Sequence, residues 1–222
     1  MPARFKAHAA QASLECHWVA PSLILNLPFP GTKAFKPLLD DLGPFKPEAN
    51  RIAAEAPARK GSDVAIRFGL RDGNIELSFF YTGFRLLLRS YDRSYAKDLR
   101  PLVKCATSHG GLDESISPGG RFCVRYQVHL RFPEASVDAL FREVVESRVP
   151  GFEPIGCSFS FRPPDLPRLM AARLLAGRST KIDEGLFLEC SLEFDGSGEL
   201  DPLPDLAMEA VGYAIESIGI LL

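Results

Sequence analysis

The chain has 222 residues, of which 46% are hydrophobic and 24% are charged, and its formal net charge is −2. This balance is typical of one globular domain, or of two small lobes that share a core, and it excludes a disordered chain. No apolar stretch approaches the roughly 20 residues that span a bilayer, and residues 1–12 lack the apolar segment of a secretory signal, so we expect a cytoplasmic protein that does not enter membranes.

The first part of the chain predicts one strand and one short helix. Residues 15–26 have the composition of a strand, and a Pro/Gly turn follows at residues 28–31. Thr32 is a suitable cap for a short helix in which Phe35, Leu38, Leu39 and Leu42 recur at helical spacing. Residues 44–61 are rich in Pro, Ala and charge and predict an irregular connection.

From residue 64 the hydrophobic period changes to two, which is typical of strands. Residues 64–70 and 75–81 each alternate apolar and polar side chains, and Asp72-Gly73 between them is a two-residue hairpin signal. Gly83 turns the chain again, and residues 84–91 predict a third strand. These three strands form a β-meander.

Helices and strands then alternate in the prediction. Residues 94–108 predict a helix despite Pro101, and residues 109–120 a flexible, glycine-rich link. Residues 121–132 are the clearest strand, with apolar side chains at every even position, and Ser136 is expected to cap the helix that follows. The remaining segments are predicted as a strand at 155–162, a helix at 166–175 ended by Gly177, a strand at 186–194 and a helix at 203–220.

This order predicts an α+β fold. Cleanly alternating strands indicate an antiparallel or mixed sheet with one solvent-facing side and helices on the other. Two ferredoxin-like lobes are one arrangement of this kind. We expect residues 1–108 to form an N-terminal lobe with the β-meander, residues 121–222 a C-terminal lobe of β-α-β-α-β-α order, and residues 109–120 the flexible link.

Short motifs keep a fixed order from Asp72 onward. Asp72-Gly73 ends a strand, Gly83-Phe84 opens the next, and Tyr91 precedes a helix. A later strand contains Arg121-x-x-Val124-Arg125-Tyr126, and a late aliphatic strand ends in Asp at residues 192–195. In these landmarks the chain resembles a sporadically distributed bacterial family of uncharacterised proteins, although Gln127-Val128 stands where that pattern has Ile-Asn. The resemblance implies the order of elements and no activity.

Motifs for covalent, metal or nucleotide chemistry are missing from the sequence. There is no G-x-S-x-G elbow, the four histidines lack metal-ligand spacing, and the glycine pairs begin no phosphate loop. The five cysteines are widely spaced without a C-x-x-C pair, and Cys157 falls on the apolar face of its strand, so we interpret them as structural thiols. We expect no cofactor and no metal.

Arginines are the strongest candidate binding residues. Guanidinium groups bind phosphates and carboxylates bidentately, so a sheet face that gathers them is a candidate partner-binding or anion-binding surface. The alternative is a solvated face on which they pair across strands with Glu76, Glu189 and Glu193. The residues on the non-core phase of the strands are Arg67, Arg71, Arg85, Arg89, Arg121, Arg125 and Arg131, together with Gln127 and His129.

Charge is also divided along the chain. All 26 Lys and Arg residues and 18 of the 28 acids lie before residue 183, whereas the last 40 residues hold the other ten acids and no base. Such division favours either internal pairing of the C-terminal segment with the body or two separate binding faces.

Three functions remain open from the sequence. The leading hypothesis is a non-enzymatic binding protein that uses the arginine-bearing face for an anionic partner, such as an acidic protein surface, a nucleic acid or a phosphorylated ligand. The first alternative is a metal-independent endoribonuclease with His129 as general base. The second is a structural subunit that uses residues 220–222 or a sheet edge as its joint, and an oligomer is compatible with all three.

Overall fold

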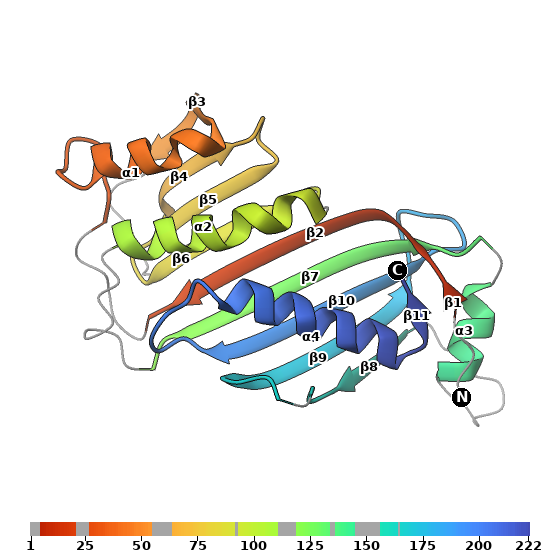
Figure 1. Cartoon of the computed structure of the whole chain (residues 1–222). Helices are drawn as coiled ribbons and strands as arrows, with labels where there is room; N and C mark the ends of the chain where they lie inside the picture. Colours follow the sequence, from red (N-terminus) through yellow and green to blue (C-terminus); the bar gives the residue numbers. More distant parts are fainter. Residues whose placement is uncertain are drawn as a thin grey trace.

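Nine strands form one antiparallel sheet that runs through the whole molecule, and helices cover one of its faces (Figure 1). The computed structural model describes residues 5–20, 27–54, 64–91, 93–110, 119–133, 136–144, 156–163 and 165–222. The strands lie in the order β3 (Pro47–Ala54), β4 (Val64–Leu70), β5 (Ile75–Phe80), β6 (Gly83–Leu88), β2 (His8–Val19), β7 (Arg121–Arg131), β10 (Leu186–Asp195), β9 (Leu169–Arg178) and β8 (Gly156–Ser160). The predicted α+β fold is confirmed.

Four α-helices and a second, small sheet complete the described fold. The helices are α1 (Phe35–Leu42), which continues into a 3-10 turn at Gly43–Phe45, α2 (Arg93–His109), α3 (Val137–Val144) and α4 (Leu203–Ser217). The chain ends meet in a parallel pair of two-residue strands, β1 (Phe5–Lys6) and β11 (Ile220–Leu221). Among the described helices, none combines the length and apolar character needed to cross a membrane.

The element order repeats. In the N-terminal half, β2 is followed by α1, a four-stranded meander and α2; in the C-terminal half, β7 is followed by α3, a three-stranded meander and α4. In both halves the last strand of the meander pairs with the first strand of that half, and β2 pairs with β7 at the centre. Neither series of described elements has the β-α-β-β-α-β order of a ferredoxin-like lobe.

The central strands decide which side chains face the helices. Leu14 pairs with Tyr126, Cys16 with Val124 and Trp18 with Phe122, and all six side chains are buried in one core with residues of α1, α2 and α4. Because side chains alternate along a strand, the intervening residues point to the opposite side of the sheet, which we call the open face.

Several local predictions are confirmed. The strand at β7 has the predicted phase, and α2 contains Pro101 within its span. Ser136 caps α3, since the amide of Ala139 donates to its hydroxyl at 3.1 Å. The hairpin between β4 and β5 also forms, but four residues, 71–74, join the strands instead of two.

Other local predictions are wrong. The helix expected at 166–175 is largely strand β9, which lies between β10 and β8, so the C-terminal order is β-α-β-β-β-α. The connection expected at 44–61 contains strand β3, and the first predicted strand corresponds to β2, which begins at His8 instead of residue 15. Thr32 does not cap α1, because its hydroxyl donates to the carbonyl of Phe29.

Several predicted segments lie only partly within the described residues, among them the predicted connection at 44–61, of which residues 55–61 fall outside them, and the strand predicted at 155–162, of which residue 155 does. Residues 111–118 of the predicted link and residues 21–26 of the first predicted strand fall outside them. The division into two lobes stays a prediction.

Candidate anion-binding site

The structure brings most of the predicted site residues to the open face. Arg67 lies on β4, Arg85 on β6 and Arg89 just after β6. The residues that lie on β7 are Arg121, Arg125, Gln127, His129 and Arg131. The two groups are built differently.

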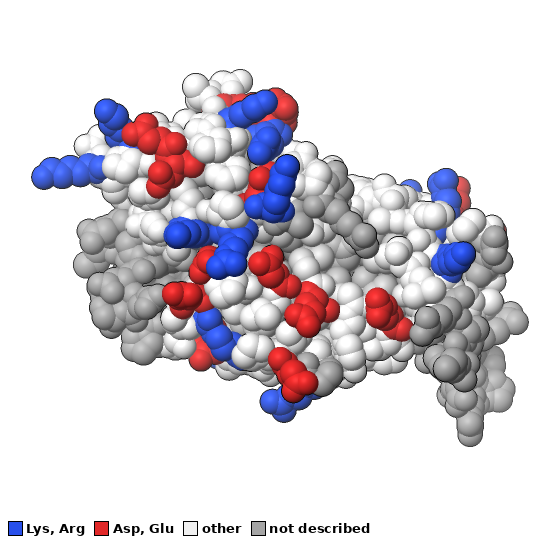
Figure 2. Space-filling model, in the orientation of Figure 1, with Lys and Arg blue, Asp and Glu red and all other residues white. Residues whose placement is uncertain are grey.

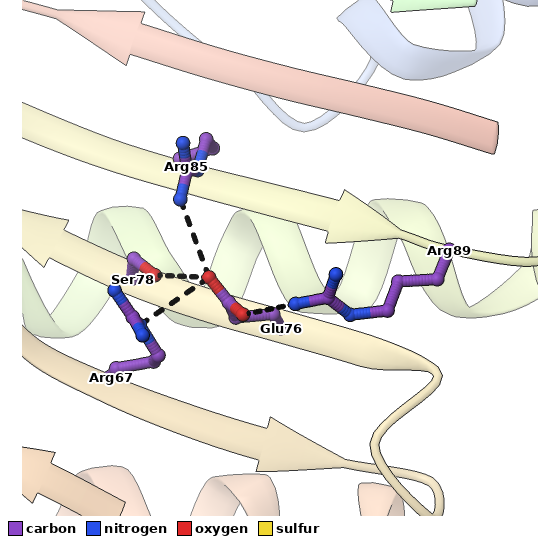
Figure 3. Close-up of polar contacts among 5 residues, drawn as sticks. All are labelled: Arg67, Glu76, Ser78, Arg85 and Arg89. Atoms are coloured by element: carbon purple, nitrogen blue, oxygen red, sulfur yellow. Dashed lines mark hydrogen bonds and ion pairs between the residues drawn. The ribbon is translucent and has the colours of Figure 1, made fainter. Parts of the chain in front are cut away.

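Three arginines of the N-terminal half surround one carboxylate (Figure 3). Oε1 of Glu76 lies 3.3 Å from Nη2 of Arg85 and 3.4 Å from Nε of Arg67, while Oε2 lies 2.7 Å from Nη2 of Arg89. The hydroxyl of Ser78 donates to Oε1 at 3.2 Å. We call Arg67, Glu76, Ser78, Arg85 and Arg89 the Glu76 cluster.

The arginines keep Glu76 ionised. Burial acts to raise the pKa of its carboxyl, because the side chain is only 12% exposed. The guanidinium of Arg67, the hydrogen bond from Ser78 and the guanidinium groups of Arg89 and Arg85 outweigh burial, so the pKa of Glu76 lies below its ordinary value.

The Glu76 cluster contains more positive than negative charge. One carboxylate faces three guanidinium groups, and it neutralises one of them. Nε of Arg85 is buried and has no hydrogen-bond partner among the described residues, and the buried Nε of Arg67 contacts Glu76 at ion-pair distance without forming a hydrogen bond. Since Glu76 neutralises only one of the three guanidinium charges, and the side chains of Arg67 and Arg89 are 43% and 56% exposed, the cluster can attract an anion from solvent.

A fourth arginine, Arg51 of β3, extends the cluster. Its side chain lies over Gly69 and Gly73, where a Cβ would stand 2.8 Å from Cβ of Arg51 and 1.4 Å from its Nη1, respectively. Together with Arg67, Glu76 and Arg89, these residues line a hollow of about 310 Å³. Arg51 also pairs with Glu48 at 2.9 Å. Because Gly69 and Gly73 have no side chains, the space over them is open to the side chain of Arg51.

The arginines of β7 are individually paired. Arg121 contacts Glu193 of β10 at 2.9 Å, and Arg125 lies 3.9 Å from Glu189. The amide of Gln127 donates to the other oxygen of Glu189 at 2.6 Å. The alternative of cross-strand pairing is confirmed for these residues. Arg131 is exposed and forms no ion pair within the described part of the chain.

His129 has a structural environment. It is 7% exposed, its Nδ1 lies 2.8 Å from the hydroxyl of Ser179, and its ring packs against Phe187. Burial, aided by the charge of Lys181, lowers its pKa and favours the neutral ring. The hydroxyl of Ser179 also accepts the amides of Lys181 and Ile182, so His129 supports the β9–β10 turn and is poorly placed to act as a general base.

The prediction that Arg71 belongs to the open face is wrong. Arg71 lies in the β4–β5 turn with a φ of 52°, and its Nη2 donates to Asp98 of α2 at 3.2 Å. Because its backbone is left-handed, Arg71 does not continue the alternation of β4. Its side chain instead connects the β4–β5 hairpin to α2.

The cysteines are thiols within or beside the core. Burial raises the pKa of Cys16, Cys105 and Cys190 to about 12 each, so they stay protonated at neutral pH. In the described residues, no group of His, Cys, Asp and Glu side chains is arranged to hold a metal ion.

The sequence was also compared with known proteins. No protein-family model matches it, and no curated protein is similar enough to count as a relative. The resemblance to a bacterial family stays a prediction, and the site has to be interpreted from its own geometry.

Proposed function

We propose that this protein is a non-enzymatic interaction protein that binds a carboxylate-rich segment of another protein through Arg51 and the Glu76 cluster. The excess of guanidinium groups around Glu76 carries the proposal. A carboxylate of the partner would enter the hollow and take the donors of Arg51, Arg67 and Arg89 that Glu76 leaves free, because arginine donates to two acceptors at once.

A protein partner fits the open face better than a nucleic acid. Proteins that bind single-stranded nucleic acids stack bases on exposed aromatic side chains. On the described open face, Phe80 is 7% exposed and lies beneath the guanidinium of Arg85, 5.6 Å from its ring centre, while Phe187 packs against His129. Neither ring is free for stacking.

Binding of a fluorescein-labelled Glu-rich peptide, followed by anisotropy, tests the proposal. The double variant Arg67→Gln/Arg89→Gln should weaken binding by about tenfold or more, since each lost charge-assisted hydrogen bond contributes roughly 1.5–3 kcal/mol. Binding to the wild type should also weaken as salt is raised.

The matched control removes two arginines that already have partners. Arg121→Gln/Arg125→Gln lowers the net charge by the same amount and should leave the affinity within about twofold. Equal losses in both variants would mean that only overall charge matters. If the protein bound single-stranded RNA and did not bind the peptide, the partner would be a nucleic acid instead of a protein.

A further inference from the structure

A hollow of about 750 Å³ lies on the helix-covered side of the sheet, between β2 and α4. Its walls come from residues 7–12, from residues 90–91 just after β6, and from α4. Small-molecule sites in proteins have volumes of about 300–1,000 Å³, so the hollow has the size of a ligand site. The sheet separates it from the Glu76 cluster, which lies on the open face.

The hollow exists because β2 is longer than the strand beside it. β6 pairs only with the second half of β2, and the amide of Tyr91 then donates to the carbonyl of Ala12 at 2.8 Å. The chain next enters α2, and β2 continues past the end of this helix (Figure 1). Along residues 8–11, no described strand takes the place of β6. The space left there is bounded by α4, by Tyr91 and, beside β11, by Leu222.

A glycine inside α4 keeps the hollow open. Gly212 lines it, and a Cβ at this position would meet no atom outside its own turn of the helix within 4 Å. Packing against another element therefore does not require a glycine here. Glycine is unfavourable inside a helix, so Gly212 makes α4 less stable than an alanine would. Such a loss of stability is typical of sites that serve a function, and here it preserves the empty space.

The lining favours a neutral ligand. None of the described residues that line the hollow is Asp, Glu, Lys or Arg, and Figure 2 shows mainly uncharged side chains over this part of the molecule. A charged ligand would lose hydration there without gaining a charge of opposite sign. His8, Gln11 and Ser90 also line the hollow and are exposed, so the polar end of a ligand would lie beside them at the rim.

Aromatic side chains form one wall of the hollow. The rings of Tyr91 and Tyr126 meet edge to face, with centres 5.9 Å apart and planes at 85°. Such rings pack favourably against further rings in edge-to-face or offset geometry. Met208 of α4 lines the hollow as well, and a thioether also packs well against an aromatic ring. These walls fit an aromatic ligand better than a saturated one.

We propose that this hollow binds a neutral aromatic small molecule, held between β2 and α4 with its polar end toward solvent. The site lies on the side of the sheet opposite the Glu76 cluster, so the small molecule and the protein partner can be bound at the same time.

Two dyes that share one ring system test the chemistry of the site. Phenylnaphthylamine is neutral and fluoresces strongly in apolar surroundings, and anilinonaphthalenesulfonate adds a sulfonate to the same rings. The neutral dye should bind the wild type saturably, with one molecule per chain, and should raise its melting temperature. In calorimetry, the anionic dye should bind at least about tenfold more weakly.

Two variants that fill the hollow from different walls test its position. Gly212→Leu and Ala9→Leu each place a larger side chain in the hollow, and each should weaken binding of the neutral dye by about tenfold or more. Gly212→Leu should also melt at a higher temperature than the wild type, because leucine is the better helix former. Ala9→Leu keeps the test decisive if the helix variant does not fold.

Two controls complete the test. Ser217→Leu adds the same side chain at an exposed position of α4 outside the hollow and should bind the neutral dye within about twofold of the wild type. Arg67→Gln/Arg89→Gln should bind it normally as well, which separates this proposal from the one for the open face. The proposal would be overturned by a wild type without saturable binding, by equal affinity for both dyes, or by undiminished binding in both folded hollow-filling variants.

Discussion

At the scale of single residues, Glu76 has two opposing effects. It stabilises the sheet because it keeps three guanidinium groups of β4–β6 from repelling one another. It also competes with any carboxylate of a partner for the same donors. Removing its charge should therefore change stability and binding in opposite directions.

We predict this outcome for Glu76→Gln. The free energy of unfolding in urea should fall by about 1–3 kcal/mol, because a largely buried charge-assisted network loses its acceptor. The affinity for the Glu-rich peptide should rise, as measured by anisotropy on the folded variant. Glu189→Gln, on the paired side of the open face, should leave peptide affinity unchanged; reduced affinity in Glu76→Gln would contradict the proposed site.

The stability difference should depend on pH with a definite sign. The pKa of Glu76 is lower in the folded than in the unfolded chain, so its stabilisation is complete above the ordinary value of 4.5 and is lost as pH falls through the lowered pKa. The unfolding curves of wild type and Glu76→Gln should converge in acid.

At the scale of elements, the alternation of apolar and polar side chains predicted strands whose own sequence has a period of two. It failed for strands that form because neighbouring strands pair with them. The strand at β7 could be read from its sequence because every second side chain is apolar. In β9, the run Leu169–Arg178 is rich in Leu, Ala and Arg, which favour helices, and it is a strand because β10 and β8 pair with both of its edges.

The same limit applies to the candidate site. The alternation of apolar and polar side chains predicts that Arg67, Arg85 and Arg89 lie on the side of the sheet away from the core. The sequence also predicts, as an alternative to partner binding, that they pair across strands with Glu76. Arg51 could not be recognised, since the Pro- and Ala-rich sequence of β3 gives little strand signal. That all three arginines share one carboxylate depends on register, which is set by the fold.

The pairing of β6 with β2 depends on a glycine. A Cβ on Gly83 would lie 1.9 Å from the carbonyl oxygen of Trp18. We predict that Gly83→Ala lowers the free energy of unfolding by about 1–3 kcal/mol, because the strands must separate. Gly43→Ala is the control, as no atom outside its own turn of the chain lies within 4 Å of its Cβ position, and equal stability of the two variants would refute the explanation.

At the scale of the whole molecule, both halves contribute to one sheet and one core. β2 and β7 pair along most of their lengths, and α2 contacts α4. The structure thus joins the two parts by strand pairing as well as by side-chain packing.

We predict a single cooperative unfolding transition. The only tryptophan, Trp18, lies on β2 against Phe122 of β7, so its fluorescence should report loss of the central pair. Its urea curve should coincide with that of circular dichroism at 222 nm, which follows the helices of both halves. Two separated transitions would instead support independent lobes.

The pairing of the chain ends has a mechanical consequence. In the parallel pair of β1 and β11, the amide of Phe5 donates to Gly219 at 2.8 Å and the amide of Ala7 to Leu221 at 2.9 Å. A pull on the two ends would shear these strands past each other and load both bonds at once. This small pair would yield first, and only then would tension reach the nine-stranded sheet.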